Sequence, residues 1–174
     1  MSLTDAEFTS IKNKCSEAYL YSVLAKVNYA VEQSHRDYDG LKIDYSIINH
    51  KIGTKRTIAS ECNEIKIQLK SVSESSASMF KDYPDYFKYR IDKKIIPIGP
   101  AFYIVVVVLP KETNFDEWVK VTTDELILKK CAYYFKVEKT LEEGFISVDK
   151  SNLFTPDTLP LLFISAEKKE EYLW

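Results

Sequence analysis

The chain has 174 residues, a formal net charge of −2, and 45% hydrophobic and 29% charged residues. These values are ordinary for a globular domain that buries a full core. We therefore expect one domain over residues 1–174, with its core at about 4–164 and a C-terminal tail at 165–174. The slightly acidic balance excludes a global basic field, so any contact with nucleic acid has to come from a local patch.

The cysteines and the apolar segments of the sequence indicate the compartment in which we expect the protein. The three cysteines are odd in number and include no C-x-x-C pair, which argues against structural disulfides and zinc sites. The N-terminal residues lack the basic region and apolar core of a signal peptide. The longest apolar run, residues 102–109, is too short to cross a bilayer. We expect a cytoplasmic protein with no membrane partner.

The N-terminal segment predicts a long helix. Thr4 and Glu7 have the spacing of a capping box, and apolar residues then recur at helical intervals to about Asn28. Glu17 lies near the edge of the apolar stripe, with Lys14 within helical reach. Two interpretations stay open for Glu17: a solvated carboxylate paired to Lys14, or a carboxylate that belongs to a site.

Two short strands form the centre of the functional hypothesis. Residues 43–47 and 65–70 both alternate apolar and polar side chains at period two. Asp44 falls in the middle of the first strand, where a carboxylate is a poor strand former and needs a reason. The second strand carries Gln68 and Lys70 on one face. An aspartate beside a Gln-x-Lys on a hairpin partner has the layout of a metal-dependent nuclease site.

Hydrolysis of a phosphodiester needs a hard cation with oxygen ligands and a positive charge for the developing anion. Gln68 could hold such a cation through its amide oxygen while Lys70 reaches water or phosphate. A neutral amide binds metal more weakly than a carboxylate does, so a further acid is needed, and Glu17 and Glu64 are the candidates. The same strand also contains a competing register, Glu64-x-Lys66, on the same face.

The remaining elements are mostly strands, followed by a helix. The fold class we expect is α/β, with a mixed central β-sheet flanked by helices. The expected elements are a short strand at 29–33, a half-buried strand at 86–91, a central strand buried on both faces at 103–109, an extended segment at 126–128, a strand at 131–137 paired with one at 145–149, a helix that begins at Thr155-Pro156-Asp157 and tolerates Pro160 in its first turn, and a helical tail at 167–174.

The chain resembles a bacterial family, domain of unknown function 4365, which belongs with the PD-(D/E)xK nuclease-like proteins. The resemblance covers roughly residues 15–163. The matching stretches are Asp39-Gly40 with Ile43-Asp44, residues 67–71, 105–110, 124–133 and 151–156. It implies a restriction-endonuclease-like core, a site at Asp44, Gln68 and Lys70, and help from a helix glutamate such as Glu17.

The same resemblance implies a metal and a substrate. Mg²⁺ or Mn²⁺ would be held by Asp44, Gln68 and Glu17, with Asp39 as the alternative ligand because the spacing from Asp39-Gly40 to Asp44 is longer than in the family.

Two hypotheses for the function follow. One hypothesis is a metal-dependent DNA endonuclease, in restriction or another defence against foreign DNA. The other is a catalytically silent nuclease-like module that binds DNA or a protein partner. A homodimer stays open. The candidate DNA-contacting cations are Lys51, Lys55, Arg56, Lys88 and Arg90.

Overall fold

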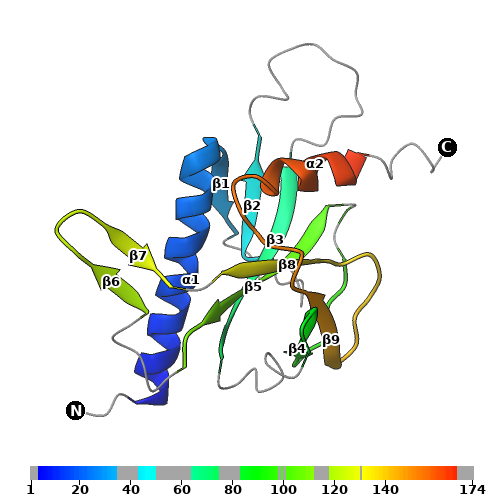
Figure 1. The fold of residues 1–174 in the computed structure, drawn as a ribbon. Helices are drawn as coiled ribbons and strands as arrows, with labels where there is room; N and C mark the ends of the chain where they lie inside the picture. The colour runs from blue at the N-terminus through cyan, green and yellow to red at the C-terminus, as the bar shows by residue number, and fades with distance from the viewer. Residues whose placement is uncertain are drawn as a thin grey trace.

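The computed structural model describes residues 4–34, 43–49, 64–74, 83–97, 99, 101–111, 118–129 and 131–167. Figure 1 shows how the elements follow one another from the N-terminus to the C-terminus. In chain order they are α1 (Asp5–Val27), β1 (Ala30–Gln33), β2 (Tyr45–Ile48), β3 (Glu64–Ser73), β4 (Tyr86–Ile91), β5 (Phe102–Leu109), β6 (Val119–Val121), β7 (Leu126–Leu128), β8 (Ala132–Lys136), β9 (Gly144–Asp149) and α2 (Leu159–Glu167).

The first helix begins and ends where the sequence predicts. Thr4 caps α1 and forms the full capping box with Glu7, whose carboxylate accepts from the Thr4 backbone N–H at 2.8 Å. The helix ends at Asn28, which adopts the left-handed conformation with φ of 58° and donates its N–H to the Leu24 carbonyl. Asparagine tolerates this region better than most residues, so it is suited to end the helix.

The central sheet has five strands in the order β1-β2-β3-β5-β8. The β3–β5 pair is parallel, and the β1–β2, β2–β3 and β5–β8 pairs are antiparallel. The expectation of a mixed central sheet in an α/β protein is therefore confirmed. Every residue of β5 is buried, as the run of apolar residues predicts for an interior strand covered on both faces.

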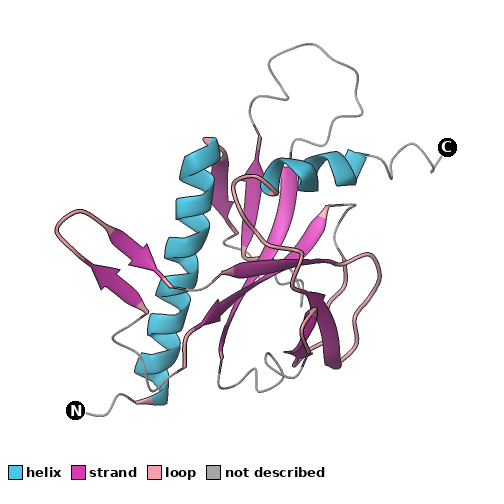
Figure 2. Ribbon diagram, in the orientation of Figure 1, coloured by secondary structure: helices cyan, strands magenta, loops and turns pink. Residues whose placement is uncertain are grey.

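Different layers cover the two faces of this sheet. Leu20 of α1 and Leu162 of α2 belong to one hydrophobic core with Ile67 of β3, so both helices lie on the same face. Phe87 of β4 and Val148 of β9 belong to a second core on the opposite face. Figure 2 shows the helices and the separate β4–β9 pair around the central strands. Helices thus cover one face, and a two-stranded sheet takes their place on the other.

Two details of the expected topology are wrong. The strand at 145–149 was expected to pair with the one at 131–137, whereas β9 pairs with β4 in antiparallel register. Asp44 was expected in the middle of a strand, whereas β2 begins one residue later, at Tyr45. Strand pairing between distant segments depends on tertiary packing, which local periodicity does not encode.

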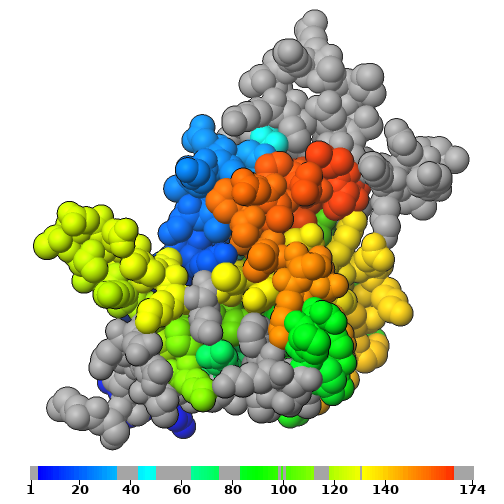
Figure 3. All heavy atoms as spheres, in the orientation of Figure 1, coloured from blue at the N-terminus to red at the C-terminus, as the bar shows by residue number. Residues whose placement is uncertain are grey.

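Other local expectations are confirmed. The strands predicted at 29–33 and 86–91 appear as β1 and β4, and Pro160 falls in the first turn of α2. The expected helix start at Thr155-Pro156-Asp157 is wrong, because these residues form a turn and α2 begins at Leu159. The extended segment at 126–128 is β7, but its partner β6 was not expected. Together β6 and β7 form a hairpin that projects from the body of the molecule (Figure 3).

Some expected features fall outside the described residues. These are Asp39, the cations Lys51, Lys55 and Arg56, and the tail from 168 to 174. Within the part of the chain that is described, no helix is long and apolar enough to cross a membrane.

Candidate functional site

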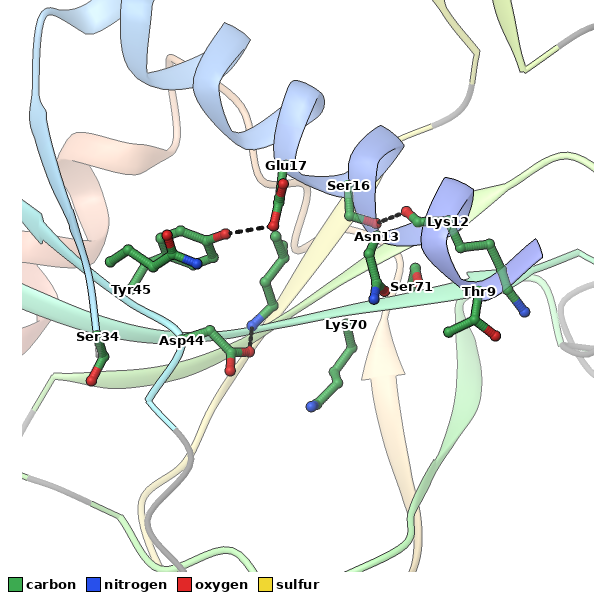
Figure 4. Close-up of a pocket in the computed structure, with 12 residues that line it drawn as sticks. Thr9, Lys12, Asn13, Ser16, Glu17, Ser34, Asp44, Tyr45, Lys70 and Ser71 are labelled. Atoms are coloured by element: carbon green, nitrogen blue, oxygen red, sulfur yellow. Dashed lines mark hydrogen bonds between the residues drawn. The ribbon is translucent and has the colours of Figure 1, made fainter. Parts of the chain in front are cut away.

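A notch in the central sheet brings the candidate residues together. β2 pairs with β3 only from Glu64 to Ile67, while β3 continues alongside β5 to Ser73. Where β2 has not yet begun, a cavity of about 450 Å³ opens between α1 and β3 (Figure 4). Its lining residues are Thr9, Lys12, Asn13, Ser16, Glu17, Gln33, Ser34, Asp44, Tyr45, Leu69, Lys70 and Ser71.

Helix α1 turns a polar stripe towards this cavity. The helical lining residues recur at the spacing of a single helix face, from Thr9 through Lys12 and Asn13 to Ser16 and Glu17. The apolar stripe of α1 meanwhile packs into the core beneath the helix. Glu17 is thus carried to the site by the same amphipathic pattern that anchors α1 to the sheet.

Asp44 occupies the edge of the notch, just before β2. Its backbone N–H donates to the Ile67 carbonyl at 3.0 Å, and its Oδ2 accepts from the Leu69 backbone N–H at 2.8 Å. The carboxylate therefore satisfies a β3 donor at the point where the regular β2–β3 ladder stops. The sequence pattern predicts that the strand includes Asp44, whereas β2 begins at Tyr45. The hydrogen bond with Leu69 explains why an aspartate is stable at this position.

Glu17 meets β2 through a tyrosine. The Tyr45 hydroxyl donates to Glu17 Oε1 at 3.0 Å (Figure 4). Burial raises the pKa of the Tyr45 phenol, and the hydrogen bond with Glu17 raises it further. The contact described for Glu17 is thus with Tyr45 on the sheet, and the alternative of an ion pair with Lys14 does not appear among the ion pairs of the described residues.

Gln68 and Lys70 lie on the face of β3 that is turned away from the helices. Ile67 and Leu69 pack with the core under α1, so the alternate residues of the strand face β4. The Gln68 side chain is 2% exposed, and its Oε1 is buried without a hydrogen-bond partner in the described structure. Leaving a buried acceptor unsatisfied costs about 1–3 kcal/mol, so this oxygen calls for an explanation.

A second cavity, of about 690 Å³, opens on this face of β3. Gln68 and Lys70 line it together with residues of β4 and the segment that follows β4. Lys70 lines both cavities, whereas Asp44 and Glu17 line the first and Gln68 the second. The structure therefore brings the four candidates to two cavities that share Lys70.

Tyr89 of β4 lines the second cavity. Burial raises its pKa to about 12, with smaller contributions from the negative charges of Asp92 and Asp44. The regular β2–β3 pairing ends at Tyr45 and Ile67, and the Asp44 N–H also donates to the Ile67 carbonyl. Asp44 therefore lies at an irregular end of the pairing, next to the part of β3 that carries Gln68 and Lys70.

The competing register lies at the N-terminal end of β3. Glu64 is exposed and pairs with Ile48, and Lys66 pairs with Ser46, so both are inside the regular β2–β3 ladder. Neither residue lines either of the two cavities. Because only Gln68 and Lys70 line a cavity, Gln68-x-Lys70 is a better candidate for the functional pair than Glu64-x-Lys66.

Two tyrosines of the site were missed in the sequence. Tyr45 directly follows Asp44 and, as the next residue in a period-two pattern, was expected only to fill the core. Tyr89 was treated as part of a half-buried strand, which is correct but incomplete. A signal for Tyr45 was available, because a tyrosine buried under a helix needs a partner for its hydroxyl and Glu17 is on that helix.

The candidate residues around the two cavities carry oxygen atoms. Among the residues that the structure describes, no three His, Cys, Asp or Glu side chains group closely enough to hold a metal ion. The donors at hand are the carboxylates of Asp44 and Glu17 and the orphaned amide oxygen of Gln68, all oxygen ligands of the kind that Mg²⁺ and Mn²⁺ take. In comparisons with protein-family models, curated proteins and solved structures, no match to this chain was found.

Proposed function

We propose that this protein is a Mg²⁺- or Mn²⁺-dependent DNA endonuclease of the PD-(D/E)xK type. The observation that carries the proposal is the Oε1 atom of Gln68, a buried acceptor without a partner in the described structure. Gln68 comes two residues before Lys70, and both line the second cavity, while Lys70 also lines the first. A bound cation would satisfy this oxygen and account for its burial.

The metal would be held by Asp44 and Gln68, with Glu17 as the further carboxylate. When bound, a divalent cation lowers the pKa of a water molecule and neutralises charge that develops on a phosphate. The Tyr45 hydroxyl keeps Glu17 directed at β2 rather than into solvent. The Leu69 N–H in turn fixes the carboxylate of Asp44 against β3. These two hydrogen bonds would orient the ligands before a metal arrives.

Lys70 is the residue we assign to the phosphate. Its position in both cavities allows one ammonium group to face the ligands of the first and the open space of the second. An ammonium is a compact point charge with rotatable donors, suited to an anion whose charge grows during the reaction. We expect Lys70 to act on the transition state more than on ground-state binding.

The activity is tested by incubating the pure protein with supercoiled plasmid and with single-stranded DNA, with and without Mn²⁺. Lys70→Met is the principal variant, and Lys66→Met is its matched control on the same strand. We expect cleavage that needs Mn²⁺, is lost in Lys70→Met and persists in Lys66→Met. Cleavage by Lys70→Met at the parent rate would contradict the assignment, and DNA binding without any cleavage would favour the silent module.

The choice between the two registers has its own test. Glu64→Ala removes an exposed carboxylate that lines neither cavity, so we expect activity close to that of the parent. Gln68→Ala removes the orphaned oxygen, so we expect both activity and metal-linked thermal stabilisation to fall. Equal losses in the two variants would show that Glu64 shares the ligand role.

A further inference from the structure

The second cavity is richer in positive charge than the protein as a whole. Four cationic side chains line it, Lys70, Arg90, Lys93 and Lys94, against two acidic ones, Asp92 and Glu143. The whole chain, by contrast, carries a net charge of −2. A local excess of cations on an acidic protein is the feature expected where an anionic ligand binds.

The ion pairs at the cavity rim do not cancel this excess. Arg90 pairs with Asp92 at 3.2 Å and Lys94 with Glu142 at 2.8 Å, and all four side chains are more than half exposed. Exposed pairs of this kind contribute little to stability, so an incoming anion can replace the carboxylates at small cost. The exposed Lys93 adds a cation to the same rim.

The remaining wall is apolar and aromatic. Tyr89, Ile91, Ile95 and Ile96 line it. Ile91 is 3% exposed and belongs to the core, whereas Ile96 is 49% exposed and presents an apolar surface to solvent. Tyr89 presents a neutral phenol at ordinary pH, and burial raises its pKa further, to about 12. A cavity with a cationic rim and an apolar wall suits a ligand that is itself part anion and part flat ring.

We propose that this second cavity binds one unpaired nucleotide of a DNA strand, with the phosphate towards Lys70 and Lys93 and the base against Tyr89 and Ile96. This inference rests on the proposed nuclease function and adds a substrate class to it: DNA with single-stranded or frayed positions. The volume of about 690 Å³ lies within the range of roughly 300–1,000 Å³ that is usual for small-molecule sites.

The geometry explains why the nucleotide has to be unpaired. A base inside a duplex is stacked on its neighbours and cannot enter a pocket unless it is first extruded, which costs a few kcal/mol, least where pairing is already absent. Aromatic and apolar walls accept unstacked bases of any sequence. Because Lys70 lines both cavities, a nucleotide held here places an adjoining phosphate at the residues proposed for hydrolysis.

The pocket is tested by isothermal titration of the metal-free protein with thymidine 5′-monophosphate, thymidine and inorganic phosphate. We expect the monophosphate to bind at least about tenfold more tightly than either part alone, since it uses both walls. Lys93→Glu and Ile96→Asp alter exposed side chains at the two walls, and we expect each to weaken binding by about threefold to tenfold. Lys120→Glu, an exposed charge reversal on β6, serves as the control and should leave binding unchanged.

Each other outcome overturns the inference. Equal binding of phosphate and monophosphate, with no effect of Ile96→Asp, would reduce the cavity to a patch for any anion. An equal loss in Lys120→Glu and Lys93→Glu would indicate overall charge rather than a pocket. Equal cleavage rates on a single-stranded oligonucleotide and on a blunt duplex would contradict the requirement for an unpaired nucleotide.

The inference and the proposed nuclease can fail separately. If the monophosphate binds as expected but no DNA is cut, the pocket stands and the nuclease assignment falls. If Lys70-dependent cleavage is found but the monophosphate does not bind and Lys93→Glu cuts normally, the pocket alone is wrong.

Discussion

The carboxylate of Asp44 accepts a hydrogen bond from the backbone N–H of Leu69 at 2.8 Å, across the point where β2 and β3 part. This contact joins structure and proposed function in one side chain. It satisfies the Leu69 N–H, which lies beyond the end of the regular β2–β3 pairing, and it holds the carboxylate against β3. An ionised carboxylate has about four acceptor sites, so a hydrogen bond from Leu69 and a bound cation are compatible.

Two substitutions separate these roles of Asp44. Asp44→Asn keeps an acceptor for the Leu69 N–H but removes the charge, so we expect near-parental stability in urea and loss of metal-linked stabilisation. Asp44→Ala removes the acceptor as well, and an unsatisfied backbone donor should lower the free energy of unfolding by about 1–2 kcal/mol. Equal stability of the two variants would show that the hydrogen bond to Leu69 contributes nothing.

The orphaned oxygen of Gln68 gives a second prediction. Gln68→Met preserves much of the volume and removes a buried, unpartnered acceptor, so without metal we expect unchanged or raised stability, by up to about 1 kcal/mol. Gln68→Glu supplies the charge that an amide lacks, so Mn²⁺ should raise the melting temperature more in this variant than in the parent. If Mn²⁺ shifts neither the parent nor Gln68→Glu, the oxygen is not a metal ligand.

Local elements could be predicted from this sequence because their signals are local. The capping box of Thr4 and Glu7, the left-handed end at Asn28 and the apolar run of β5 each depend on residues close in the chain. The pairing of β9 could not be predicted, because a strand that alternates buried and exposed residues fits more than one partner. Val148 of β9 lies opposite Phe87 of β4 and packs in the same core, and this tertiary contact selects β4 as the partner of β9.

In the candidate site too, features set by neighbouring residues could be predicted and features set by distant residues could not. Period-two spacing placed Gln68 and Lys70 on one face, which agrees with their shared cavity. The sequence could not show that β2 begins only after Asp44, since the notch depends on where two strands separate. It also could not show that Gln68 Oε1 lacks a partner, because burial and hydrogen bonding at that atom depend on elements distant in the chain.

Alkaline pH provides a prediction from Tyr89. The folded protein holds the pKa of this phenol at about 12, above its ordinary value of 10, chiefly through burial. The raised pKa stabilises the folded protein fully below pH 10. This stabilisation declines as the pH rises towards 12, because Tyr89 loses its phenol proton at lower pH in the unfolded chain than in the folded protein. Tyr89→Phe has no such proton, so it should lose less stability over this range. Parallel losses in urea denaturation of the two proteins would contradict the burial of Tyr89.

The salt dependence of DNA binding gives the last prediction. Four described cations line the second cavity, and for a single strand each phosphate contact contributes about −0.7 to the slope of log affinity against log salt. Four contacts, from Lys70, Arg90, Lys93 and Lys94, would give a slope no steeper than about −3.

Fluorescence anisotropy of a labelled single strand across a salt series measures this slope directly. Lys93→Glu should make the slope shallower by about 0.7, and Lys120→Glu should leave it unchanged. Lys70→Met should change it by no more than one contact while abolishing cleavage, because its charge acts mainly on the transition state. A slope much steeper than about −3 in the parent, unaffected by Lys93→Glu, would place the DNA on a different surface of the protein.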